Sequence, residues 1–417
     1  MHPLRSRSLR LVCLLSFAAV SLAACQRRVV VSGPTSTPVT PTDAALRSAV
    51  QADVQRVLDR ARGDSAFPGA FAVVGTHAVV LAEYGVGTLD WAPSPRPDEH
   101  TMWDLASLTK VIGLTTAIMQ LAEQQRIDLS APLQRYLPNW TGRNKEKVTV
   151  RHLLTHTSGL PAFKAYDEIT HDPDSLAKLM FATPLDTVPG AKMVYSDIGA
   201  YMLGRLVEEI SGQSLDVYLH DHVFEPLGMH ETTYRPPISL WARIAPTELD
   251  TVQRRRLVRG MVHDERAYYL GGVSAHAGLF SSGHDLARFA QMYLNGGTLD
   301  GVRVIQPASI AQFTAYADST FSNRGIGWQK PELPGMRFTT AAPWAGHTMS
   351  GSSYGHTGFT GTSIGMDPTR DLFVILLSNR VDPTRNNNKI SEVRRQLGDA
   401  IVRDFDRLQT TAHTMNP

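Results

Sequence analysis

Residues 102–113 read Met102-Trp103-Asp104-Leu105-Ala106-Ser107-Leu108-Thr109-Lys110-Val111-Ile112-Gly113. Apolar residues then recur at helical spacing to Ala122, which predicts a buried helix with Asp104 as its N-cap. Ser107 and Lys110 would share one face of this helix, because residues three apart are neighbours there. A serine hydroxyl needs an adjacent base to become a nucleophile, and burial favours the neutral form of a lysine. The spacing therefore predicts a catalytic pair. The alternative is an ordinary solvated helix start.

The composition of the chain is that of a globular protein. Of its 417 residues, 42% are hydrophobic and 19% are charged, which allows one large domain or two ordinary ones. The formal net charge of +2 becomes about −1 if a leader carrying Arg5, Arg7 and Arg10 is removed, which argues against a nucleic-acid partner. Cys13 and Cys25 are the two cysteines, so we expect no disulfide in the mature domain.

Residues 1–24 have the pattern of a signal peptide. The three arginines precede an apolar run over residues 11–24, which is too short to span a bilayer as a mature helix. The run ends in Leu22-Ala23-Ala24-Cys25, which resembles a bacterial lipobox and predicts lipidation of Cys25. Gln26 replaces the aspartate that commonly retains such lipoproteins at the inner membrane, so the resemblance implies outer-membrane sorting. An ordinary signal peptide cut near Ala24 is the alternative.

The rest of the chain predicts a tether followed by one α+β domain. Residues 25–43 are rich in Pro and Thr and predict an extended tether. The domain is expected over residues 44–411. It has a helix and a hairpin near its start (43–62, 70–75 and 78–85) and a hairpin and a helix near its end (362–367, 372–378 and 390–408). We therefore expect an antiparallel sheet built from both chain ends and flanked by the terminal helices, with a mostly helical lobe between them.

A second motif, Tyr195-Ser196-Asp197, precedes a predicted helix. A suitably placed phenol can accept the serine proton and later return it to a leaving group. The alternative is a packing tyrosine, with Asp197 capping the next helix.

A third motif, His356-Thr357-Gly358, is followed by Phe359 and leads toward the final hairpin. Glycines allow a strand edge to approach a ligand, and backbone N–H groups there can stabilise an oxyanion. A glycine-rich turn is the alternative. The spacing does not match Gly-x-Gly-x-x-Gly, so we expect no dinucleotide site.

His152 and His156 are four apart in a segment predicted to be helical, a spacing that can bind zinc. Leu153 stands where metalloproteases carry a glutamate, so we expect no metal site. We expect both histidines to hydrogen-bond loops that position the site.

Together, the three motifs make the chain resemble the serine β-lactamase-like superfamily over roughly residues 44–408. The resemblance is closest to the group of class C β-lactamases, DD-peptidases and esterases. It also includes Leu153-Leu154-Thr155-His156-Thr157-Ser158-Gly159-Leu160 and the stretch over residues 271–282. It implies the β-lactamase/transpeptidase-like fold.

The resemblance also implies roles for residues. Ser107 would be the acylated nucleophile, Lys110 would take part in proton transfer, and Tyr195 would match the general-base tyrosine of the family. The backbone N–H groups of Ser107 and Phe359 would form the oxyanion hole. The residues that the resemblance implies for substrate binding are Asp197, His356, Thr357, Gly358 and Phe359. Whether Lys110 or Tyr195 is the formal base stays open.

Two positions depart from the family pattern. Asp197 stands where asparagine is usual, and it would raise the pKa of Lys110 unless its side chain turns away. His356 stands where lysine is usual. If it faced the substrate, it would titrate near neutrality and favour carboxylate-bearing substrates when protonated.

These expectations describe a lipid-anchored serine hydrolase without a cofactor, facing the periplasm. It would act through an acyl-enzyme on an ester, amide or β-lactam carbonyl, most simply as a cell-envelope esterase or peptidase. Its partners would be a small-molecule or peptidoglycan-derived substrate and the membrane. A class C-like β-lactamase and a non-catalytic cell-wall-binding lipoprotein are the alternatives.

Overall fold

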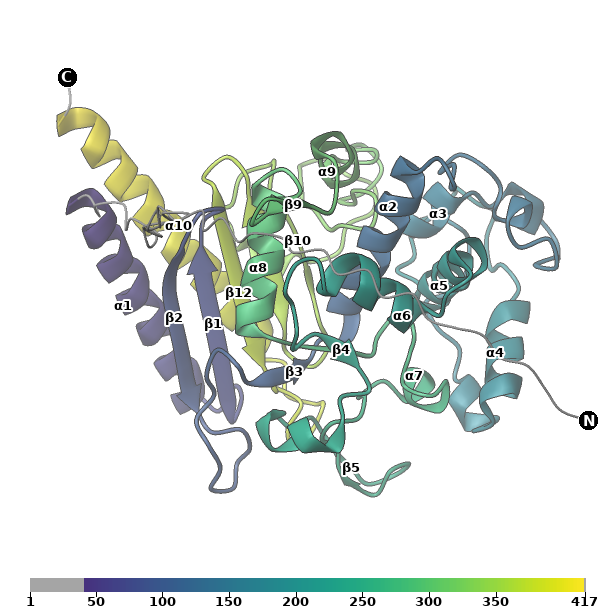
Figure 1. The fold of residues 1–417 in the computed structure, drawn as a ribbon, viewed down its shortest axis with the longest axis horizontal. Helices are drawn as coiled ribbons and strands as arrows, with labels where there is room; N and C mark the ends of the chain where they lie inside the picture. Colours follow the sequence, from purple (N-terminus) through teal and green to yellow (C-terminus); the bar gives the residue numbers. More distant parts are fainter. Residues whose placement is uncertain (1–40, 416–417) are drawn as a thin grey trace, which may run out of the picture. The chain divides into compact units, whose positions relative to one another are not determined.

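The computed structural model describes residues 41–415, and side chains over residues 44–408 (Figure 1). The predicted signal peptide, Cys25 and the tether up to residue 40 lie outside the described residues. Residues 41–43, predicted to end the tether, instead begin the first helix, α1 (Pro41–Gly63).

A five-stranded antiparallel sheet joins the two ends of the domain, as predicted. Its strand order is β10-β11-β12-β1-β2. The hairpin β1 (Gly69–Gly75) and β2 (Val80–Gly87) comes from the start of the domain. The strands β10 (Tyr354–Thr357), β11 (Ser363–Asp367) and β12 (Leu372–Ser378) come from its end. Pairing of Ala70 with Ser378 and of Gly75 with Phe373 sets the register between the two ends.

Both faces of the sheet are covered, which explains why every residue of β1 and β12 is buried. Helices α1 and α10 (Ile390–Met415) pack together on one face, and α8 (Gly283–Leu294) packs on the other (Figure 1). Successive side chains of a strand point to opposite faces. Accordingly, Val73 belongs to the core under α8, whereas Ala72 and Val74 belong to the core under the terminal helices.

A mostly helical lobe lies between the two halves of the sheet in sequence, as predicted. Its α-helices are α2 (Thr116–Glu123), α3 (Val150–Leu154), α4 (Pro173–Ala182), α5 (Asp197–Ser211), α6 (Leu215–Leu219), α7 (Glu265–Tyr269) and α9 (Pro307–Thr314). A smaller sheet has the order β3-β7-β4, formed by Met102–Asp104, Leu279–Ser282 and Thr233–Tyr234. Two short hairpins complete the strands: β5 (Leu249–Asp250) with β6 (Arg256–Leu257), and β8 (Thr298–Leu299) with β9 (Val302–Arg303).

Within residues 41–415, no helix combines the length and the apolar character needed to cross a membrane.

Candidate active site

The segment that carries Ser107 differs from the predicted helix. Asp104 ends strand β3, and its buried carboxylate accepts hydrogen bonds from Ala106 N–H (2.8 Å) and His263 N–H (2.6 Å). A 3₁₀ turn over Ala106–Leu108 and a π-helical segment over Lys110–Thr115 precede α2. The prediction that Asp104 caps a single helix was therefore wrong. Ala106 has φ +46°, a conformation that costs energy for a residue with a side chain and is often found beside functional groups.

Lys110 contacts Ser107 as the spacing predicted. Its Nζ donates to Ser107 Oγ (3.1 Å) and to His276 O (2.8 Å), and it forms an ion pair with Asp197 Oδ1 (2.8 Å). Burial alone would lower the pKa of Lys110, but the Asp197 carboxylate and Tyr195 outweigh it and raise the pKa above its usual value. Asp197 thus acts on the pKa of Lys110 in the expected direction, and the ion pair favours the ammonium form.

Asp197 can reach Lys110 because another residue caps the helix. Ser196 is the N-cap of α5, and its Oγ accepts from Gly199 N–H at 3.0 Å. The alternative in which Asp197 caps this helix is therefore wrong.

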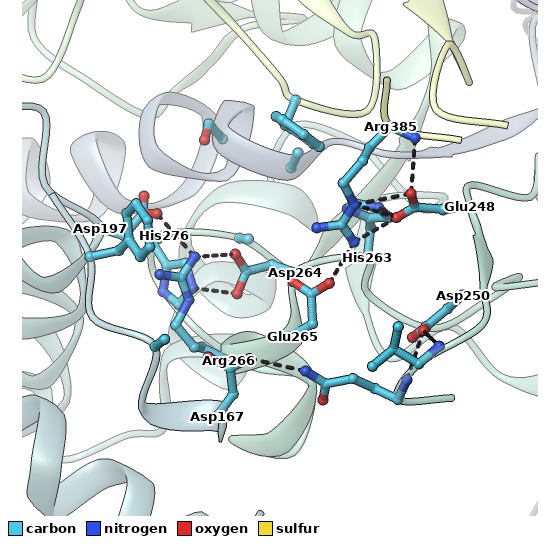
Figure 2. A pocket seen from close by; sticks show the side chains of 18 of the residues that line it. Asp167, Asp197, Glu248, Asp250, His263, Asp264, Glu265, Arg266, His276 and Arg385 are labelled. Carbon is cyan, nitrogen blue, oxygen red and sulfur yellow. Dashed lines mark hydrogen bonds and ion pairs between the residues drawn. The ribbon is translucent and has the colours of Figure 1, made fainter. Parts of the chain in front are cut away.

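A chain of charged side chains extends from Asp197 along one wall of the site (Figure 2). Arg266 Nη2 lies 3.5 Å from Asp197 Oδ2 and 2.9 Å from Asp264 Oδ2, while Asp264 Oδ1 lies 3.0 Å from His276 Nε2. Burial would raise the pKa of Asp264, but His276 and Arg266 hold it well below its usual range. The motif search missed Asp264 and Arg266. The charged run Asp264-Glu265-Arg266 was their only signal.

Tyr195 also contacts Lys110, whose Nζ lies 4.9 Å from the centre of the tyrosine ring. Its buried hydroxyl has no hydrogen-bond partner of ordinary geometry among the described residues. The rings of His156 and His356 lie 4.5 and 5.8 Å away, and Arg324 Cζ lies 5.2 Å from the ring centre. Lys110 is close enough for Tyr195 to help raise its pKa through charge and a side-chain hydrogen bond, so the phenol oxygen lies beside the ammonium group.

His156 and His152 hold loops, as expected. His156 Nδ1 accepts from Ser196 N–H (3.1 Å), and His152 Nδ1 accepts from Thr149 N–H (3.2 Å). The predicted helix that would carry both ends at Leu154, and His156 has φ +58°. The helical premise of the zinc alternative was therefore wrong.

The third motif brings strand β10 against the nucleophile loop. A Cβ on Gly358 would stand 2.4 Å from Leu105 O, so only glycine fits without displacement. Thr360 and Thr362 fix this approach through hydrogen bonds to Asp104 O (2.6 Å) and Leu105 O (3.1 Å). The backbone N–H groups of Ser107 and Phe359 have no hydrogen-bond acceptor within the described part of the chain. Both are available for the predicted oxyanion hole.

A cavity of about 650 Å³ opens onto Ser107. Tyr195, Asp197 and Phe359 line it, whereas His356, Thr357 and Gly358 do not. His356 is buried, and its Nδ1 lies 2.9 Å from Thr357 O. Burial, Arg324 and Lys110 hold the pKa of His356 well below its usual value. The expectation that His356 binds substrate in the cavity is therefore contradicted, because the residue is buried and does not line the cavity.

The guanidinium groups that line the cavity are all paired with carboxylates (Figure 2). Besides Arg266, the lining includes Arg385, which forms ion pairs with Glu248 and with Glu265. Burial would raise the pKa of Glu248, but hydrogen bonds from His263 and Arg385 lower it to about 2. The described lining therefore offers no unpaired guanidinium to a substrate carboxylate.

With this geometry in view, the sequence was compared with known proteins. Residues 52–399 match the family described as Beta-lactamase. The chain belongs to the beta-lactamase family. A relative from Salmonella schwarzengrund named "Putative D-alanyl-D-alanine carboxypeptidase" is 33% identical over 324 residues, which are 71% of this chain and 73% of the relative. A relative of the same name from Salmonella enteritidis is 32% identical over the same shares.

Solved structures confirm the fold of this family member. A hydrolase with promiscuous acyltransferase activity superposes with a TM-score of 0.68 at 20% identity, covering 87% of this chain and 100% of the other. A class C beta-lactamase mutant superposes with a TM-score of 0.67 at 19% identity, covering 88% and 100%. The protein is thus a serine hydrolase of the β-lactamase, DD-carboxypeptidase and esterase type, with the β-lactamase/transpeptidase-like fold.

Proposed function

We propose that this serine hydrolase cleaves D-amino-acid peptides of the cell envelope through an acyl-enzyme on Ser107. The observation that carries the proposal is the ion pair between Lys110 and Asp197 at 2.8 Å. It keeps Lys110 cationic and leaves the free oxygen of Tyr195 as the proton acceptor. The substrate class is supported by the relatives named as D-alanyl-D-alanine carboxypeptidases.

In the proposed mechanism, Tyr195 accepts the Ser107 proton while Oγ attacks the carbonyl carbon. Lys110 orients Oγ through its 3.1 Å hydrogen bond and offsets negative charge in the transition state. The N–H groups of Ser107 and Phe359 stabilise the oxyanion. Tyr195 then gives its proton to the leaving amine. In deacylation it accepts a proton from the attacking water and returns it to Ser107 Oγ as the ester bond breaks.

The test of the nucleophile is covalent labelling. A fluorophosphonate and a fluorescent penicillin should label the wild type, and Ser107→Ala should abolish labelling. Equal labelling of both proteins would refute the assignment of Ser107. Hydrolysis of a D-Ala-D-Ala peptide, nitrophenyl esters and nitrocefin by one preparation then ranks the substrate classes.

Neutral esters are the second candidate, and a specific observation favours them. Because Arg266 and Arg385 are paired with carboxylates, the cavity holds a substrate carboxylate weakly. We expect nitrocefin to be a poor substrate, since His356 supplies no charge where family members carry lysine. The D-Ala-D-Ala peptide also carries a carboxylate, so its rate relative to the neutral esters decides between the two candidates. Rapid nitrocefin turnover that requires Ser107 would favour the class C-like β-lactamase instead.

We also propose that the enzyme is anchored in the outer membrane through acyl chains on Cys25, facing the periplasm. The proposal is supported by the lipobox-like Leu22-Ala23-Ala24-Cys25 and by Gln26. Radiolabelled palmitate should enter the wild type and not Cys25→Ala. Equal incorporation would rule out this anchor.

A further inference from the structure

The Tyr195 phenol needs a positive charge beside it if it is to act as the base. An ordinary tyrosine keeps its proton until about pH 10. The family lysine is replaced by His356, which is held neutral, and the charge of Lys110 is shared with Asp197. The described residues around Tyr195 therefore have to supply a cation from elsewhere.

Arg324 lies where such a cation is required. It is only 3% exposed, and its Cζ lies 5.2 Å from the centre of the Tyr195 ring. Its Nη2 donates to Thr340 Oγ1 (3.1 Å), while Nε and Nη1 have no hydrogen-bond partner in the part of the chain that the structure describes. No carboxylate within residues 44–408 forms an ion pair with it. A buried guanidinium with unpaired donors is costly and calls for a nearby anion.

The charge of Arg324 acts on the whole cluster around Tyr195. Burial lowers the pKa of Arg324 to about 10, and Tyr195 is the group that opposes this shift. After burial, Arg324 is the largest cause that lowers the pKa of His156 and of His356, the two rings that flank Tyr195. Arg324 does not line the cavity, so its charge reaches the reaction through Tyr195.

The loop that carries Arg324 is fixed on several sides. Ala317 N–H donates to Arg324 O (2.8 Å), and Gly327 N–H donates to Leu154 O (3.0 Å). Gln329 pairs with Gly355 of β10, with two backbone hydrogen bonds of 3.0 Å. The guanidinium is therefore held in place before substrate binds.

We propose that Arg324 is a positioning residue that stabilises the Tyr195 phenolate. The charged and titratable groups that face Tyr195 are then Lys110 with its partner Asp197, His156, His356 and Arg324. Among these, Arg324 is the one group that is cationic at neutral pH and has no carboxylate partner within the described residues. The inference rests on the proposed role of Tyr195 as the base.

The test is the pH profile of kcat/KM for a neutral nitrophenyl ester. Arg324→Met should shift the acid limb of the profile to a pH higher by about 1 unit or more. It should also lower kcat/KM at neutral pH by about tenfold or more. The loss should shrink at alkaline pH. Arg324→Lys should stay close to the wild-type profile. Ultraviolet absorbance of tyrosinate, taken as the difference from Tyr195→Phe, should appear at higher pH in Arg324→Met.

A control variant separates this effect from damage to the loop. Lys330→Met removes another buried cation of the same loop, whose Nζ donates to Ser352 O (2.8 Å), and it should leave the acid limb unchanged. Arg324→Met should keep its Tm, because an apolar side chain often replaces a buried charge without loss. A loss that is independent of pH, or one that Arg324→Lys does not rescue, would overturn the inference. If Ser107→Ala and Tyr195→Phe are inactive in that case, the proposed function still stands.

Discussion

The charges on the two sides of Ser107 differ in whether they have partners of opposite sign. On one side, the charges of Lys110, Asp197, Arg266 and Asp264 alternate in sign, each contacts an opposite charge, and His276 lies 3.0 Å from Asp264. On the other side, Tyr195 contacts two histidines and Arg324, and the Asp197 carboxylate reaches it only through Lys110. The paired side holds each of its groups in one protonation state, whereas the unpaired side allows the Tyr195 oxygen to lose and regain a proton.

This difference assigns the two proton-handling residues. A pair at 2.8 Å stabilises the charged form of Lys110, so proton transfer through it would cost the energy of the pair. Tyr195 has no carboxylate partner, and Lys110 is the side chain that interacts with its hydroxyl, so a proton can leave this oxygen without breaking an ion pair. Each prediction below changes one side and measures whether the other side responds.

The largest effect is expected from Tyr195→Phe. Loss of a general base should lower kcat/KM by about 10²–10⁴-fold on every substrate that acylates Ser107. Stability should change little, because the hydroxyl forms no hydrogen bond that meets ordinary geometry and Lys110 keeps its bonds to Ser107, His276 and Asp197. Steady-state kinetics and Tm check both expectations. Tyr201→Phe, on helix α5, is the control and should keep wild-type kinetics. Wild-type rates in Tyr195→Phe would instead transfer the role of base to Lys110.

A smaller effect, on stability, is expected from Asp197→Asn. Removing one partner of a buried pair costs about 3–5 kcal/mol, and we expect roughly 2–3 kcal/mol because Asp197 is 21% exposed. The folded-state pKa of Lys110 is raised above 10.5, so this stabilisation is complete below that pH and is lost as the pH rises through the folded-state pKa. Urea unfolding at neutral and strongly alkaline pH should show the difference from wild type shrinking.

Asp216→Asn is a matched control for that experiment. Asp216 is 20% exposed and pairs with the exposed Arg235, away from Ser107. Its loss should cost less than about 1 kcal/mol. Equal losses in the two variants would show that the Lys110 pair stabilises the fold no more than a surface pair.

The sheet and the Ser107–Lys110 contact were predictable because their signals are local. Alternating strands, hairpin turns and a three-residue spacing are read directly from the chain. The start of the nucleophile segment was not predictable, because pairing of Trp103 with Ser281 in the smaller sheet overrides the capping signal of Asp104.

The electrostatic partners of the motifs were harder to find, because they come from distant segments. Arg266 reaches Asp197 across 69 residues of sequence, and no spacing rule connects them. The error on His356 has another cause. Its residue type suggests titration near neutrality, whereas its burial behind the cavity wall is set by tertiary packing. The sequence thus identifies reactive groups more readily than it identifies what controls their charge.

The smallest effect is expected on the unpaired side, from His156→Asn. Burial, followed by Arg324, holds the pKa of His156 well below 6.5. The unfolded chain therefore binds a proton below pH 6.5 that the folded protein excludes, and the free energy of unfolding falls as the pH decreases toward the folded-state pKa. Asparagine tolerates the φ of +58° and can accept the Ser196 N–H in place of Nδ1. Between pH 7 and 5, His156→Asn should lose up to about 2 kcal/mol less stability than wild type.

Urea unfolding at the two pH values measures this difference in stability loss. His152→Asn is the matched control. In the wild type, His152 Nδ1 also accepts a backbone N–H, but the side chain is only half-buried, so its replacement should flatten the pH dependence less. Identical slopes in wild type and His156→Asn would mean that His156 is protonated in the folded protein and that the unpaired side carries more charge than Tyr195 could use.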